Sequence, residues 1–205
     1  MFITFEGIEG SGKTTQIQRC AAFLRSKGYD VVQTREPGGT AFGRCLRQLI
    51  LDPQQSFRHA YTEVLLFYAD RLEHIETVIR PALSEGKMVV CDRYVDSTIA
   101  YQMGGRGISM QMIDSLNHTI DLWPDHTILL DLDAAEGILR AKKRAALDRF
   151  EHETLSFHES VRQAYLDQAK KYPKRIRCFS VQNLNPDAVF SEIRPYLESI
   201  IGASI

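Results

Sequence analysis

Five short apolar runs recur along the chain and are separated by segments with helical spacing. The runs lie at residues 1–5, 31–34, 88–91, 127–130 and 176–181, and the last is weaker than the others. Because apolar and polar residues hardly alternate within them, they are typical of strands that are covered on both faces. Strands that alternate with helices predict an α/β fold with a five-stranded parallel sheet and helices on both faces.

The clearest helix is predicted over residues 61–83, where apolar residues recur every three or four positions. Its predicted buried face consists of Val64, Leu65, Tyr68, Leu72, Ile75 and Ile79. Phe67 lies beside this stripe and not on it. Gly86 follows the end of the helix, which leads directly into the run at 88–91.

Another helix is predicted close to the C-terminus. Asn185 and Pro186 are typical of a helix cap and a first helical position. The predicted buried residues of this helix are Val189, Ile193, Leu197 and Ile200. Pro195 should kink it, because the proline ring removes an interior hydrogen bond. Repeats, low-complexity tracts and linkers are absent from the sequence, so we expect a single domain over residues 1–205.

The composition fits such a domain and narrows its partners. The chain has 205 residues, 44% of them hydrophobic, with 25 basic and 26 acidic side chains, so it lacks the basic field that favours nucleic acid. No apolar stretch is long enough to cross a membrane and no leader pattern begins the chain, so we expect a cytoplasmic protein. The cysteines and histidines show no metal-ligand spacing, and we expect His152 and His158 at the surface.

One stretch near the start matches the phosphate-loop pattern G-x-x-x-x-G-K-[ST] at every position. Its residues are Gly7, Ile8, Glu9, Gly10, Ser11, Gly12, Lys13 and Thr14. It lies between a predicted strand and a helical pattern, where backbone N–H groups and the helix dipole converge on an anion. Lys13 should reach the terminal phosphates, and the Thr14 hydroxyl should ligate magnesium. An ordinary glycine-rich turn is the alternative, which the complete pattern and its context disfavour.

Two further clusters follow predicted strands at the same edge of the sheet, where open α/β sheets bind ligands. Residues 35–40, R-E-P-G-G-T, come after the second run, and a plain Pro-Gly turn is the alternative. Asp92, Arg93 and Tyr94 come after the third. The carboxylate of Asp92 is suited to magnesium-bound water and the guanidinium of Arg93 to phosphate. A capped strand end with an ion pair is the alternative here.

A third charged cluster follows the fourth run by one predicted helix. It contains Arg140, Lys142, Lys143 and Arg144, and the letters L-D-R-F-E follow at residues 147–151. Such a run is ordinarily a solvated helix face. Its position also suits a mobile lid over phosphates, at about residues 138–153. The residues alone leave both interpretations open.

Taken together, these motifs resemble the bacterial thymidylate kinase (dTMP kinase) family over nearly the whole chain. The resemblance rests on residues 5–15 (F-E-G-I-E-G-S-G-K-T-T), 35–40, 66–71 (L-F-Y-A-D-R), 92–94, 97–98, 101–102, 104–107 (G-G-R-G) and 147–151. It implies a three-layer P-loop NTPase fold of the nucleoside monophosphate kinase type. It also implies a homodimer that phosphorylates dTMP to dTDP with ATP and magnesium, in dTTP synthesis.

The resemblance assigns roles to individual residues. The loop at residues 7–14 would hold the phosphates of ATP, Glu9 would approach the sugar of dTMP, and Arg93 would hold its phosphate. Phe67 would stack on thymine and Arg71 would hydrogen-bond the base, with core packing and a surface ion pair as the alternatives. The other dTMP-binding residues that it implies are Arg35, Pro37, Ser97, Thr98, Tyr101 and Gln102. The implied metal ligands are Thr14 and Asp92, directly or through water.

The family divides by the place of its catalytic arginine, either in the phosphate loop or in the lid. This loop has no arginine, whereas the charged run has Arg140 and Arg144, so the chain resembles the lid-arginine type. Lys142 stands where related lids often have a third arginine, and a lysine cannot make the bidentate contact. The expected catalytic cations are therefore Lys13, Arg93, Arg140 and Arg144.

Two alternatives to this function remain at this point. The nearer is another P-loop kinase that acts on a nucleoside or a different monophosphate, which the implied thymine pocket disfavours. The other is a nucleotide-binding switch or regulatory module without metabolic transfer. A guanine-reading [NT]-K-x-D motif is absent from the sequence, which weighs against a switch.

Overall fold

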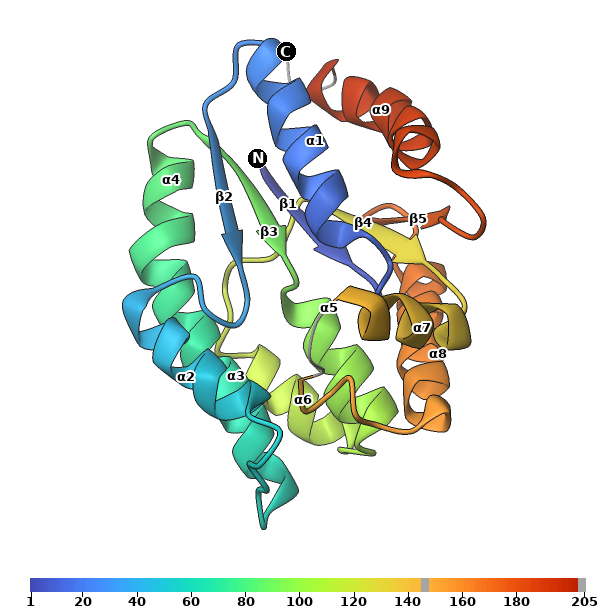
Figure 1. Cartoon of the computed structure of the whole chain (residues 1–205). Coiled ribbons are helices and arrows are strands. Elements are labelled where there is room, and N and C mark those ends of the chain that lie inside the picture. Colours follow the sequence, from blue (N-terminus) through green and yellow to red (C-terminus); the bar gives the residue numbers. More distant parts are fainter. Residues whose placement is uncertain (145–147, 203–205) are drawn as a thin grey trace.

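A computed structural model describes residues 1–144, apart from the side chain of Arg144, and residues 148–202 (Figure 1). Five parallel strands form one sheet in the order β2-β3-β1-β4-β5. They are β1 (Phe2–Glu6), β2 (Val31–Arg35), β3 (Met88–Asp92), β4 (His126–Asp131) and β5 (Ile176–Ser180). This confirms the predicted five-stranded parallel sheet.

Helices connect the strands and cover the sheet. They are α1 (Lys13–Ser26), α2 (Ala41–Leu51), α3 (Ala60–His74), α4 (Arg80–Ser84), α5 (Val95–Thr98), α6 (Met110–Asn117), α7 (Ala134–Arg144), α8 (Leu155–Lys171) and α9 (Pro186–Gly202). Two π-helical segments, η1 (Ile75–Ile79) and η2 (Ile99–Gly105), continue α3 and α5. None of the helices in the described part of the chain is both long and apolar enough to cross a membrane.

Alternate residues of β3 show that both faces of the sheet are covered. Met88 and Val90 belong to the hydrophobic cluster that includes Leu24 of α1. Val89 and Cys91 belong to a second cluster that includes Ile79 of η1. Side chains of successive strand residues point to opposite faces, so the sheet is the middle of three layers. Near-continuous apolar strands are the sequence signature of this arrangement.

The C-terminal helix has the predicted start and the predicted buried face. The Asn185 side chain accepts a hydrogen bond from the backbone N–H of Ala188 at 2.9 Å, and Pro186 is the first residue of α9. Pro195 lies inside the helix. The residues predicted to be buried are all buried, namely Val189, Ile193, Leu197 and Ile200.

The helix predicted over residues 61–83 differs from the prediction in two ways. It consists of α3, η1 and α4 in unbroken succession, because a π-helical turn interrupts the α-helical pattern. Two residues assigned to its buried face, Leu65 and Leu72, are 48% and 40% exposed, so the prediction was wrong for them. Arg71 and His74 are buried instead. The inner face of α3 is therefore partly polar, which the spacing of apolar residues cannot reveal.

Candidate active site

A cavity of about 300 Å³ opens at the carboxyl ends of β1, β2 and β3. The strand order brings these three ends together, which is the position where open parallel sheets bind ligands. The predicted site residues that line it are Glu9, Gly10, Gly12, Lys13, Thr14, Arg35, Pro37, Phe67, Arg71, Asp92, Arg93, Ser97, Thr98, Tyr101 and Gln102. Gly7, Ile8 and Ser11 of the predicted loop are not part of the lining.

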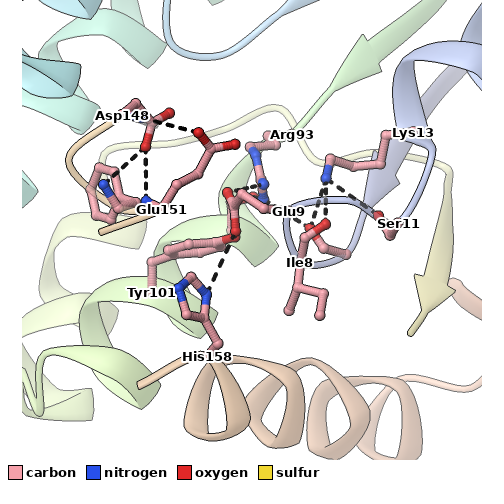
Figure 2. A network of polar contacts seen from close by, with 12 residues as sticks. Ile8, Glu9, Ser11, Lys13, Arg93, Tyr101, Asp148, Glu151 and His158 are labelled. Atoms are coloured by element: carbon pink, nitrogen blue, oxygen red, sulfur yellow. Dashed lines mark hydrogen bonds and ion pairs between the residues drawn. The ribbon is translucent and has the colours of Figure 1, made fainter. Parts of the chain in front are cut away.

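The phosphate loop closes around the ammonium group of Lys13. Lys13 is the first residue of α1 and is only 8% exposed. Its Nζ donates hydrogen bonds to the backbone oxygens of Gly7 and Ile8, both at 2.9 Å (Figure 2). Burial, and then the charge of Arg93, lower the pKa of Lys13 to about 8. The loop thus holds a cation at the amino end of α1, where the helix dipole also attracts anions.

The glycines of this loop are required by its backbone. Gly10 and Gly12 have φ angles of 75° and 88°, in the left-handed region that favours glycine. A Cβ atom on Gly10 would lie 2.4 Å from the backbone oxygen of Gly137 in α7. The loop therefore packs against the first turns of the helix that carries the predicted lid.

Arg93 is the central cation of the site. It follows β3 with a φ of 70°, a left-handed conformation that is uncommon outside glycine. Its Nη2 donates to Glu9 Oε1 at 2.6 Å, and its Nη1 donates to the Gly7 oxygen at 3.0 Å and to the Tyr165 hydroxyl at 3.1 Å. Burial alone would lower the pKa of Arg93, but Tyr101 and Glu9 raise it well above its usual value.

Glu9 joins the phosphate loop to the helices below it. The Tyr101 hydroxyl donates a hydrogen bond to Glu9 Oε2 at 2.5 Å, on the side away from Arg93 (Figure 2). Burial would raise the pKa of Glu9, but the charges of Arg93 and Lys13 outweigh it and lower that pKa. Glu9 therefore stands in the cavity as a carboxylate with one oxygen toward each partner.

His158 of α8 lies beneath Glu9 (Figure 2). Its Nδ1 is 4.0 Å from Glu9 Oε2, and the residue is 1% exposed. The expectation that His158 lies at the surface was wrong, whereas His152 is exposed as expected. His158, Val161 and Tyr165 follow one another at helical spacing and are all buried, so α8 turns this face toward the site.

Glu6, at the end of β1, anchors the groups around Arg93. It is fully buried and accepts hydrogen bonds from the Tyr94 N–H at 2.7 Å, the Ser97 hydroxyl at 2.6 Å and the Tyr165 hydroxyl at 2.9 Å. Burial, and then the neighbouring Asp96, raise the pKa of Glu6 to about 7. Sequence reasoning missed this residue because it ends an apolar strand, and nothing in the pattern reveals that its partners converge there.

The far end of the cavity contains an aromatic ring and a buried guanidinium. Phe67 is partly buried, with its ring centre 6.1 Å from that of Phe150. Arg71 is 1% exposed, and its Nε donates to Glu36 Oε2 at 2.8 Å, while its Nη2 donates to Thr98 Oγ1 at 3.0 Å. Its Nη1 is buried without a hydrogen-bond partner in the described part of the chain. A buried donor without a partner is costly, so this nitrogen is suited to a ligand oxygen.

The carboxylate that holds Arg71 was not predicted as a site residue. Glu36 is 3% exposed and also contacts His74 Nδ1 at 2.9 Å. Burial would lower the pKa of Arg71, but Glu36 outweighs it and raises that pKa. His74 in turn contacts the Thr34 hydroxyl at 2.6 Å. The Arg71 guanidinium is thus held by Glu36 of the R-E-P-G-G-T turn, and Glu36 is held in turn by His74 of α3.

Two predicted metal ligands lie at the mouth of the cavity, beside the loop. Thr14 Oγ1 is 3.4 Å from Asp92 Oδ2, and both residues line the cavity. Arg35 is exposed and Pro37 buried, and both belong to the same wall. The Pro37 oxygen accepts a hydrogen bond from Arg47 Nη1 at 2.9 Å. Arg47 also lines the cavity, and sequence reasoning missed it.

Of the two predicted lid arginines, Arg140 does not line the cavity. Arg140 pairs with Glu136 at 2.9 Å, one turn earlier on α7, and its side chain is 33% exposed. Arg144 ends α7, and its side chain lies outside the described residues. Lys142 and Lys143 are exposed. Within residues 148–151, Asp148, Phe150 and Glu151 do line the cavity, so the segment that follows the predicted lid arginines reaches the site.

The fold and the site together define a P-loop phosphotransferase, with a phosphate loop between β1 and α1 and a cavity beside it. The family model of thymidylate kinase matches residues 5–193. The chain belongs to the thymidylate kinase family.

Several thymidylate kinases are similar to this chain over most of its length. A thymidylate kinase from Pseudomonas putida (strain W619) is 50% identical over 177 residues, which cover 85% of this chain and 86% of that protein. Another thymidylate kinase, from Pseudomonas putida (strain GB-1), is 46% identical over 204 residues, which cover 98% of this chain and 96% of that protein. The crystal structure of thymidylate kinase from Ehrlichia chaffeensis has a TM-score of 0.79 at 40% identity and covers 97% of this chain and 98% of that one.

Proposed function

We propose that the cavity at the carboxyl edge of the sheet is where this thymidylate kinase transfers a phosphoryl group from ATP to dTMP, giving ADP and dTDP. The observation that carries the proposal is the continuity of one cavity from Lys13 of the phosphate loop, past Arg93, to Phe67 and Arg71. It offers cations at one end and an aromatic ring with a free donor at the other. A nucleoside monophosphate combines the matching groups, a phosphate and a flat polar base.

In this arrangement dTMP lies between Arg93 and Arg71. Its phosphate binds the guanidinium of Arg93, which is oriented by an ion pair between Arg93 Nη2 and Glu9 Oε1 at 2.6 Å. Its thymine stacks on Phe67 and accepts a hydrogen bond from the free Nη1 of Arg71. Arg35, Pro37, Ser97, Thr98 and Tyr101 complete the walls around the sugar and base.

The donor end holds ATP through the loop at residues 7–14. Lys13 would contact the outer phosphates of ATP. Because the acceptor is already an ionised phosphate, no strong general base is needed. Transfer then rests on alignment and on stabilisation of developing charge by Lys13, Arg93 and the lid arginines.

The oxygen atoms of Thr14 and Asp92 fit a magnesium ion. A hydroxyl and a carboxylate 3.4 Å apart are hard donors of the kind this ion prefers, and Mg²⁺ commonly keeps water between itself and such groups. When bound, magnesium neutralises charge on the outer phosphates of ATP. We propose Thr14 as a ligand and Asp92 as a second one, directly or through water.

We further propose that about residues 138–153 act as a lid, with Arg140 and Arg144 as its cations. Support comes from the family resemblance and from the packing of α7 against Gly10 of the phosphate loop. Closing the lid excludes water, which would otherwise accept the phosphoryl group.

The partner of this chain is proposed to be a second copy of itself. Leu65 and Leu72 are two helical turns apart on α3, and both are exposed. Phe42 and Leu49 repeat the same spacing on the adjacent α2, with 48% and 41% exposure. Exposed large apolar side chains at the same spacing on two neighbouring helices are typical of a surface that associates with another protein chain.

The function is tested by ADP release with ATP and magnesium, scanned over the common nucleoside monophosphates. We expect the highest kcat/KM for dTMP and a much lower value for dCMP, dAMP and dGMP. Release that is equal for all acceptors, or absent with every one, would contradict the proposal. A higher value for another monophosphate would identify a different P-loop kinase.

A further inference from the structure

Behind the base end of the cavity, one buried carboxylate fixes the orientation of an amide. Gln102 of η2 lines the cavity and is 1% exposed. Its Nε2 donates a hydrogen bond to Glu63 Oε1 at 2.9 Å. Glu63 lies on α3, is 4% exposed and does not line the cavity. The contact is therefore made in the wall, out of reach of solvent.

The chemistry of Glu63 allows only this orientation of the amide. Arg149 Nη1 lies 2.6 Å from Glu63 Oε2, and Arg106 Nε lies 3.4 Å from Glu63 Oε1. Both guanidinium groups thus pair with the Glu63 carboxylate inside the wall. A carboxylate can only accept hydrogen bonds, so it must face the NH₂ group of Gln102 and not its oxygen. The atom that Gln102 can offer to a base is then Oε1, an acceptor.

The base end of the cavity therefore offers one hydrogen-bond donor and one hydrogen-bond acceptor, each held in place by the wall. Arg71 contributes its unpartnered Nη1, a donor, and Gln102 contributes Oε1, an acceptor. A pyrimidine with a carbonyl beside a ring N–H, such as thymine or uracil, matches this pair. Cytosine has an amino group beside an unprotonated ring nitrogen, and it mismatches both groups.

We propose that Glu63 is a positioning residue that sets the base specificity of this kinase, by holding the Gln102 amide with its oxygen toward the base. The inference rests on the proposed function, because it requires that the nucleotide base lies at this end of the cavity. If Glu63 could also donate, the amide could turn and present its NH₂ group to cytosine.

The test compares Glu63→Gln with Glu63→Asp. The measured quantity is the ratio of kcat/KM for dUMP to that for dCMP, because neither nucleotide carries the thymine methyl group. In Glu63→Gln the new side chain can both donate and accept, so the ratio should fall at least about tenfold, the range that one polar mismatch commonly covers. In Glu63→Asp the side chain remains an acceptor, so both rates should fall while the ratio stays within about threefold.

Two further variants separate specificity from structure. Arg106→Met removes one ion pair of Glu63 but leaves its contact with Gln102, and it should leave the ratio unchanged. Gln102→Met removes the amide and should lower the ratio as much as Glu63→Gln does, even where that variant folds poorly. Thermal unfolding checks each fold.

The outcomes distinguish this inference from the function on which it rests. An unchanged ratio in Glu63→Gln or Gln102→Met, or an equal fall in Glu63→Gln and Glu63→Asp, would overturn the role of Glu63. A wild-type chain that does not phosphorylate dTMP would overturn the proposed function instead.

Discussion

Pairs of charged residues that are buried or partly buried are the common feature of this site. Arg71 is held by Glu36, Arg93 by Glu9, and Arg149 by Glu63, in each case with a nitrogen to oxygen distance below 3 Å. Removing one member of a buried pair commonly costs about 3 to 5 kcal/mol, because the other is left without a partner. Substitutions here therefore need a control for folding before their effect on rate is interpreted.

Glu6 gives the stability of the protein a specific dependence on pH. Its pKa is raised from 4.5 to about 7 in the folded chain, so between these values the folded state binds more protons than the unfolded state. The contribution of Glu6 to the free energy of unfolding is present below about pH 4.5 and is lost as pH rises through about 7. We predict that the stability advantage of wild type over Glu6→Gln shrinks across this interval.

Urea unfolding of both chains between about pH 4.5 and 8 measures this difference. Glu73→Gln, an exposed site on α3, is the matched control and should show no such trend. A difference between wild type and Glu6→Gln that stays constant, or that grows with pH, would refute the assignment.

Individual site residues divide into those that a motif predicts and those that it does not. Lys13, Arg93, Arg71 and Phe67 belong to short motifs, and the structure brings them into one cavity. Glu63, by contrast, was not predicted as part of the site. It acts through contacts with segments about 40 and 90 residues away, which no local spacing records.

At the scale of elements, the strands were predictable and one helix was only partly so. A parallel strand that is buried on both faces is a short, nearly continuous apolar run, as in β1, β3 and β4. The helix α3 buries polar groups toward the cavity, such as Arg71, and exposes Leu65 and Leu72 on its outer side. Periodicity finds an apolar face, but it does not show whether that face meets the core or a partner.

The helix α7 carries Arg140 and Arg144, the cations of the proposed lid. We predict that Arg144→Ala lowers kcat on the order of a thousandfold, and far more than it raises the KM for dTMP, because its contact strengthens when the lid is shut. Arg144→Lys should be intermediate, since it restores charge without the forked geometry.

Steady-state kinetics of this series measures the effect, with Arg140→Ala as the neighbouring comparison. Arg140 has a partner in Glu136, so part of its charge is already neutralised on α7. Indistinguishable kcat values for all three side chains at position 144 would make the charged run a solvated helix face after all.

In the whole molecule, α2 and α3 lie side by side (Figure 1), and their exposed apolar side chains form the proposed contact between two copies. We predict that wild type has about twice the 23.3 kDa mass of one chain in light scattering, and that Leu65→Asp reduces it to one chain. A charge placed in a buried apolar contact loses its hydration without gaining a partner. Leu155→Asp, at an equally exposed leucine on α8, should remain dimeric. A wild-type monomer, or dimers in all three proteins, would remove this face from consideration.

The Phe67 end of the cavity is proposed to hold the base of dTMP while the phosphate loop holds ATP. The most direct test of this proposal is the KM of each substrate in Phe67→Ala, with Glu73→Ala on the same helix as control. Loss of one base-stacking contact is worth about 1 to 3 kcal/mol, which corresponds to roughly 5- to 150-fold. We predict that the KM for dTMP rises within that range in Phe67→Ala while the KM for ATP and both control values stay unchanged. A rise in the KM for ATP alone, or no rise in either, would contradict it.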